Sequence, residues 1–321
     1  MKRLEISTGV CILVCLLATA CQSETIPAVS QPNGALELRD VRVSADTRAL
    51  GATAITEIGV YVTTKGHAVL NAAVPQLIYK YQSGTWLSDN APEITASEVD
   101  ANPVYAFYPS TLTVTNSATG SHTVPVRIEA DNFTLGKQTD YLYATAAPVA
   151  VYAAKRAVTF TMWHALAKVS FRVVKSTNVT EALVLKKVEL LSGTNRLQGG
   201  NNGTMNLTNG VLNGLAATNS IVLEGSAALT ALQSQPNVSA LVAPMTAKES
   251  RLSFRLTVEV TETNGTVTSR SFDTATVTEV QWQAGKHYTY AITVDKMGGS
   301  LTNVLIDEWK NDANQNTGIG I

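Results

Sequence analysis

Residues 158–173 read VTFTMWHALAKVSFRV. Toward the end of this stretch Val169, Phe171 and Val173 alternate with polar residues. Alternation with a period of two is typical of a strand that buries one of its faces. The pattern therefore predicts a half-buried strand with these three side chains on its inner face. We also expect Trp163, from the same stretch, and Tyr290 to be core residues.

The same alternation of apolar and polar residues occurs in segments before and after this stretch. Strands are predicted over residues 36–44, 58–62, 77–86, 104–109, 123–128, 141–144, 183–191, 252–260, 266–272, 287–294 and 302–306. Ser83-Gly84 and Asn264-Gly265 are typical hairpin turns, and the Gly/Asn-rich residues 199–203 are expected to form a loop. Many short strands at regular spacing are typical of β-sandwiches. The sequence thus predicts an all-β fold.

The first predicted strand, residues 36–44, has an irregular pattern. Its apolar residues are Leu36, Leu38, Val41 and Val43, so the spacing is two, then three, then two. A spacing of three breaks the alternation of strand faces. We therefore expect one slip in register within this strand.

Composition excludes several functions. The chain has 321 residues, a net charge of −1 and 15% charged residues, against roughly 25% in ordinary soluble domains. A net charge this close to zero does not indicate the basic surface that nucleic-acid binding requires. The four histidines are scattered, and the chain has no phosphate-binding loop, zinc-protease motif or serine-hydrolase elbow. The sequence therefore predicts a protein that is not an enzyme and that uses no cofactor or metal.

The N-terminus has the pattern of an export signal. Lys2 and Arg3 precede an apolar stretch, residues 6–20, that is too short to span a bilayer comfortably. Small residues lie just before Cys21 and resemble a bacterial lipobox, in which the cysteine is acylated. We predict a lipoprotein signal peptide over residues 1–20 and a tether over 21–35. The alternative is an ordinary secretory signal with a chance cysteine.

Several motifs, in order along the chain, resemble the fimbrillin-like proteins of Bacteroidales, which include the major and minor fimbrillins of pili. They are Thr47-Arg48-Ala49 before Ile58-Gly59-Val60-Tyr61, Tyr105-Ala106-Phe107-Tyr108-Pro109, Asp140-Tyr141-Leu142-Tyr143-Ala144, His164 to Phe171, Trp282 to Tyr290 with the pattern Trp-x-x-Gly-x-x-Tyr-x-Tyr, and Ile306-Asp307-Glu308-Trp309. Together they extend over residues 47–309.

This resemblance implies two transthyretin-like β-sandwich domains in tandem. We place them at residues 36–155 and 156–309, followed by a polar tail over 310–321. It also implies export as a lipoprotein anchored through Cys21 to the outer membrane, and then cleavage after an arginine. Arg48, before Ala49, is the best match for that site, with Arg42 and Arg39 as alternatives.

In the family, cleavage removes the first strand, here residues 36–48, and another fimbrillin subunit supplies a replacement by strand addition. The resemblance therefore predicts a structural or adhesive pilus component at the cell surface, in the fimbrium, with other fimbrillin subunits as partners.

One feature departs from a pilus shaft subunit. The tail after Trp309 is polar, whereas a donor strand needs apolar residues at alternate positions. Residues 301–309 are the only suitable C-terminal donor, so a tip, accessory or anchor subunit is an alternative position. The rival function is a monomeric, outer-membrane-anchored lipoprotein that binds a host or bacterial surface glycan or protein. The four tryptophans could line a glycan platform, but core packing is the favoured role, since three of them lie in family motifs; Trp86 is the least constrained.

Overall fold

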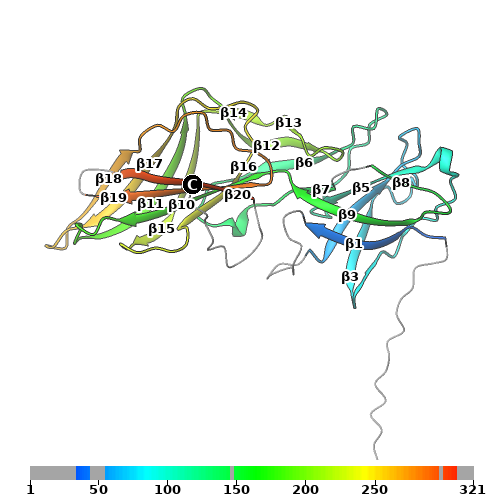
Figure 1. Cartoon of the computed structure of the whole chain (residues 1–321), viewed down its shortest axis with the longest axis horizontal. Helices are drawn as coiled ribbons and strands as arrows, with labels where there is room; N and C mark the ends of the chain where they lie inside the picture. The colour runs from blue at the N-terminus through cyan, green and yellow to red at the C-terminus, as the bar shows by residue number, and fades with distance from the viewer. Residues whose placement is uncertain (1–33, 44–54, 145–147, 296–298, 309–321) are drawn as a thin grey trace, which may run out of the picture. The chain divides into compact units, whose positions relative to one another are not determined.

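The computed structural model describes residues 34–43, 55–144, 148–295 and 299–308. These residues fold almost entirely as β-strands (Figure 1). Two short 3-10 helices, η1 (Glu98–Asp100) and η2 (Leu135–Lys137), interrupt them, and the described residues contain no α-helix. The fold class is therefore all-β, as the alternation predicts.

The first sheet has eight strands. Its order is β1-β9-β7-β5-β2-β3-β4, and β8 also pairs with β5. The strands are β1 (Glu37–Val43), β2 (Glu57–Val62), β3 (Leu77–Gln82), β4 (Thr85–Leu87), β5 (Asn102–Tyr108), β7 (Leu142–Ala144), β8 (Val149–Val151) and β9 (Ala157–His164).

Three four-stranded sheets contain the remaining strands. One has the order β16 (Val238–Val242), β10 (Ala167–Lys175), β19 (Lys286–Val294) and β20 (Gly299–Glu308). The next has the order β15 (Ser220–Leu229), β11 (Ala182–Ser192), β17 (Leu252–Thr261) and β18 (Val267–Asp273). In the last, β12 (Leu197–Asn206) pairs with β6 (Thr123–Ile128), β13 (Leu212–Asn213) and β14 (Ala216–Thr218).

The apolar side chains form three core clusters. The first-sheet cluster contains residues from Leu36 to Met162, and the C-terminal cluster is built mainly by residues 167–294. A junction cluster combines Tyr61, Tyr105 and Phe107 with residues such as Met205 and Leu241. All described residues fall in one compact unit, and β9, which follows the predicted boundary at residue 155, pairs with β1 and β7. The division into two domains stays a prediction.

The core prediction is confirmed for the strand that contains Phe171. Phe171, Val169 and Val173 are all fully buried in the C-terminal cluster. Tyr290 is also fully buried there, and its hydroxyl accepts a hydrogen bond of 2.9 Å from Nε1 of Trp282.

The core prediction is wrong for Trp163, whose side chain is 43% exposed. Val158, Phe160 and Met162 are buried along β9. Because successive side chains of a strand point to opposite faces, the tryptophan after Met162 points outward.

The predicted loop over residues 199–203 is also wrong, because these residues lie within β12. Its pairing with β6 shifts register between Gly200 and Gly203, and Gly200 has a φ of +101° that other residues rarely adopt. Gly199 pairs with β14, and Gly200 and Gly203 pair with β6, so these residues join the sheet although glycine and asparagine have little strand propensity.

His122 is a buried histidine beside the junction cluster. Its Nδ1 accepts a hydrogen bond of 3.1 Å from the Ser117 amide, so the neutral ring carries its proton on Nε2. That atom has no hydrogen-bond partner among the described residues. The rings of Tyr61 and Tyr105 each lie 5.0 Å from the His122 ring, and that of His67 lies 6.2 Å away. Burial, and then His67, lowers the pKa of His122.

This environment predicts a pH-dependent stability. Below about pH 6.5 the unfolded chain binds a proton at His122 that the folded chain does not, so stability rises with pH. The contribution is complete above about pH 6.5 and is lost as the pH falls below that value. Urea unfolding between about pH 5 and 8 should therefore show a smaller loss of stability at acidic pH in His122→Gln than in the wild type. Equal pH profiles would contradict this assignment.

Candidate functional site

The strand β1 lies at the edge of the first sheet and pairs with β9 in parallel (Figure 1). Its register runs from Glu37 opposite Ala157 to Val43 opposite Met162 and shifts between Leu38 and Asp40. This irregularity confirms the slip that the apolar spacing predicts. It brings Val41 back to the inner face, so that one strand can present residues spaced by two and then by three to the same core.

Apolar side chains hold β1 in place. Leu36, Leu38 and Val41 are buried in the first-sheet cluster, and Val43 packs against that cluster while partly exposed. Removing this surface from water is favourable, at about 25 cal/mol for each Å² of apolar area. We call the apolar surface that these four side chains cover the first-strand groove.

Hydrogen bonds at the start of β1 fix its position along the groove. The Leu36 amide donates to the Pro92 carbonyl at 2.9 Å, and the Glu37 amide donates to the Arg156 carbonyl at 3.1 Å. The buried hydroxyl of Tyr79 donates to the Leu36 carbonyl at 2.8 Å. Burial also raises the pKa of Tyr79, so this hydroxyl stays protonated and remains a donor. Any strand seated in this groove would need a carbonyl at the same place to accept this hydrogen bond.

Charged residues cover the outer face of β1. Arg39 pairs with Glu37 at 3.1 Å, and Arg42 pairs with Asp40 at 2.6 Å. All four side chains are at least 40% exposed, and such pairs contribute about 0–1 kcal/mol each. The inner apolar side chains therefore dominate the attachment of β1.

The predicted site residues Cys21, Arg48 and Ala49 lie outside the described residues. The alternative cleavage residues Arg39 and Arg42 lie within β1. A protease needs an accessible, unpaired backbone. Cleavage at either alternative therefore requires β1 to separate from β9 first.

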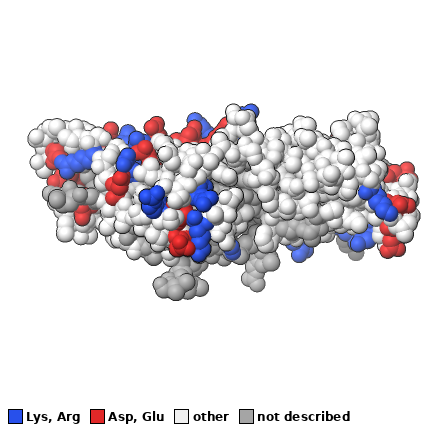
Figure 2. All heavy atoms as spheres, turned by 90° about the horizontal axis from the view of Figure 1, so that it is seen from above, with Lys and Arg blue, Asp and Glu red and all other residues white. Residues whose placement is uncertain are grey.

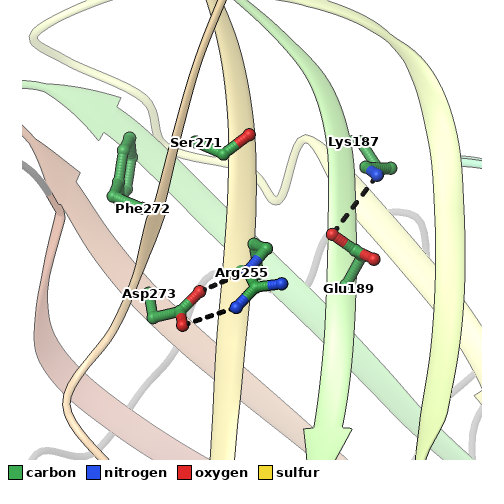
Figure 3. A pocket seen from close by; sticks show the side chains of 6 residues that line it. All are labelled: Lys187, Glu189, Arg255, Ser271, Phe272 and Asp273. Atoms are coloured by element: carbon green, nitrogen blue, oxygen red, sulfur yellow. Dashed lines mark hydrogen bonds and ion pairs between the residues drawn. The ribbon is translucent and has the colours of Figure 1, made fainter.

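A shallow hollow lies on the exposed face of the sheet that contains β11, β17 and β18 (Figure 3). Arg255 donates to both carboxylate oxygens of Asp273, at 2.6 and 2.8 Å, and Lys187 lies 3.3 Å from Glu189. Arg255 also lowers the pKa of Asp273, first by hydrogen bonding. The four charges pair with one another, so the hollow has no free charge with which to attract an ion.

Within the described residues, no group of three or more His, Cys, Asp or Glu side chains could hold a metal ion. No helix in the same part of the chain is long and apolar enough to cross a membrane.

The sheets and buried clusters define an all-β protein of the β-sandwich type. A family model described as fimbrillin-like matches residues 42–309, so the chain belongs to the fimbrillin-like family. No curated protein matches it.

Solved structures share the fold. A fimbrial protein from Bacteroides vulgatus has a TM-score of 0.62 at 11% identity, over 84% of this chain and 99% of that one. A candidate cell adhesion protein from Bacteroides ovatus has a TM-score of 0.56 at 22% identity, over 88% of this chain and 100% of the other. One from Bacteroides uniformis has a TM-score of 0.56 at 20% identity, over 86% and 98% of the two chains.

Proposed function

We propose that this chain is a fimbrial subunit of the cell surface that is exported as an outer-membrane lipoprotein and assembled by strand addition. The observation that carries the proposal is β1 itself, an edge strand that covers an apolar groove and is followed by the predicted cleavage site Arg48. Loss of the strand would expose the first-strand groove and the edge of β9. An unpaired edge with empty apolar pockets accepts a strand from another chain.

The geometry defines the strand that would fit. It would run parallel to β9 and present apolar residues with the spacing of Leu36, Leu38, Val41 and Val43. A strictly alternating donor would need a bulge at the position of the present register shift, because otherwise its second apolar pair would face outward.

The C-terminal donor candidate, residues 301–309, is engaged through residue 308. The strand β20 pairs with β19 in antiparallel orientation, and Val304 packs against the C-terminal cluster. Donating this segment would break that ladder and expose the underlying core. This cost favours a donor from a different subunit, and with it a tip, accessory or anchor position for this chain.

Trimming at Arg48 tests the assembly. An Arg-specific protease should remove the first strand, and the trimmed protein mixed with partner fimbrillins should give ladders on SDS gels without boiling. Arg48→Ala, treated identically, should stay monomeric because β1 keeps the groove filled. As a matched variant, Arg48→Lys treated with a Lys-specific protease should again lose the first strand and form ladders. A trimmed protein that stays monomeric and takes up no strand from partner fimbrillins would contradict the proposal.

The anchor has its own test. Acylation of Cys21 would add more than one chain, which a stable anchor requires. In a Bacteroides-type host, Cys21→Ala should lose palmitate-analogue labelling and leave the membrane fraction, whereas Cys15→Ala should behave as the wild type. A Cys21→Ala variant that still takes up the label would refute the lipobox assignment.

The rival function, a monomeric anchored glycan-binding lipoprotein, does not gain support from Trp86. This side chain is 5% exposed and packs in the first-sheet cluster, with its ring 5.3 Å from that of Tyr81. A side chain so enclosed cannot serve as a sugar platform in the folded protein. Among the described tryptophans Trp163 is the exposed one, because Trp282 is also buried.

A further inference from the structure

Two long segments of the chain carry almost no charge. Residues 101–126 contain no Lys, Arg, Asp or Glu, and residues 197–247 contain Glu224 alone. The pairing of β6 with β12 brings these segments together in one sheet. A broad area of the surface is correspondingly free of charged side chains (Figure 2). Over the whole chain, 15% of the residues are charged. In these two segments the polar side chains are instead mostly amides and hydroxyls.

A row of cross-strand neighbours in the first sheet includes Phe107, which belongs to the first of these uncharged segments. Gly59 lies opposite Phe107, Phe107 opposite Tyr143, and Tyr143 opposite Trp163. Phe107 is fully buried over Gly59, where an added Cβ would lie 2.3 Å from its ring. Trp163 is the last described residue of the row and is 43% exposed. The indole is therefore an exposed ring on the surface of the first sheet.

The turn between β12 and β13 adjoins the same row. Gly210 has a φ of +69°, and an added Cβ there would lie 2.1 Å from the Tyr143 ring, so the turn rests on that ring. The Oδ1 atoms of Asn206 and Asn209 accept hydrogen bonds from the amides of Thr208 and Val211, at 2.8 and 3.0 Å. Their Nδ2 groups carry no hydrogen bond to a described residue and can donate to a ligand.

We propose that Trp163 is the stacking platform of a binding site for neutral carbohydrate, with the turn of residues 206–211 as its polar rim. The flat indole would pack against the C–H face of a pyranose ring through dispersion. The amide donors would hydrogen-bond to sugar hydroxyls. The rim has no charge, and Arg42, which lies opposite Thr161 on β9, is already paired with Asp40 at 2.6 Å. This fits a neutral sugar, since a sialylated or sulfated one would lose its ionic hydration without a free cation in return.

The site uses no residue of β1, although Trp163 lies in the strand with which β1 pairs. Trp163 lies in β9 and the rim lies between β12 and β13, so removal of residues 36–48 would leave both in place. The proposal therefore fits an adhesive subunit in a pilus and equally an anchored monomer, and its failure would not bear on the assembly test at Arg48.

Saturation-transfer NMR on the full chain tests the site. The neutral probes are mannohexaose, maltohexaose and N-acetyllactosamine, and the acidic probes are sialyllactose and a heparin hexasaccharide. We expect at least one neutral probe to bind, and Trp163→Ala to lose at least about tenfold in affinity. Trp163→Phe should retain part of the binding because it keeps a ring. High salt should leave binding unchanged because no charge contributes.

Tyr81→Ala is the matched control, because Tyr81 is 48% exposed and lies on β3, which β7, β5 and β2 separate from β9. It should bind as the wild type does. Thermal unfolding of Trp163→Ala would establish that the fold persists. The proposal fails if no neutral probe binds, if only the acidic probes bind, or if folded Trp163→Ala binds as tightly as the wild type.

Discussion

Phe171→Ala should lower the free energy of unfolding by about 3–5 kcal/mol, the usual cost of deleting a buried aromatic ring. Phe171 is fully buried, and its ring lies 4.9 Å from that of Phe254 and 5.6 Å from that of Tyr290. The three rings contact one another between two sheets, since Phe254 and Tyr290 are themselves 4.5 Å apart. The deletion would leave a cavity that strands on both sides cannot close.

Urea unfolding measures this effect. Leu232→Ala is the control, because that apolar side chain is 91% exposed and its removal should change stability by no more than about 0.5 kcal/mol. A cost for Phe171→Ala below about 1 kcal/mol would show that the strand buries its other face.

Leu36→Ala should cost about 2–5 kcal/mol if β1 and the first sheet unfold together. Leu36 is fully buried, and its backbone is held by Pro92 and by the hydroxyl of Tyr79. The same change should weaken the attachment of β1 to the groove. An Arg-specific protease should then cut the variant within β1, at Arg39 or Arg42, faster than it cuts the wild type.

Two measurements separate these effects. Urea unfolding reports global stability, and the rate of cleavage within β1 reports local opening. Arg42→Lys is the control, since it keeps the outward charge while removing one cleavage residue. Unchanged stability together with an unchanged cleavage rate would mean that Leu36 does not anchor β1, and the first-strand groove would lose its physical basis.

Local pattern in the sequence was sufficient for much of the fold. The alternating segments became strands because burying one face of a strand requires a period of two. The slip in residues 36–44 is visible in the spacing of four apolar residues and reappears as the register shift of β1. The turn Ser83-Gly84 has positive φ at both residues, 48° and 88°, which such hairpin turns need. The ordered motifs also led to the family.

Pairing was decided by the tertiary structure, because hydrogen bonds between distant strands leave no local pattern. Residues 199–203 became part of a strand once β6 and β14 lay beside them, although glycine and asparagine are poor strand formers. Likewise, nothing within β1 shows that its neighbour is β9 or that the two run parallel.

The candidate sites show the same division. Local residue patterns are enough to show which residues of β1 are apolar and where a lipobox and a cleavage residue would lie. The tertiary structure decided the direction of Trp163, since the burial of Phe160 and Met162 sets the face of each side chain in β9. It also brought two uncharged segments, far apart in the chain, into one sheet, and it set Gly210 against Tyr143, the cross-strand neighbour of Trp163. A surface is a property of residues that folding makes neighbours, and no single stretch of sequence contains it.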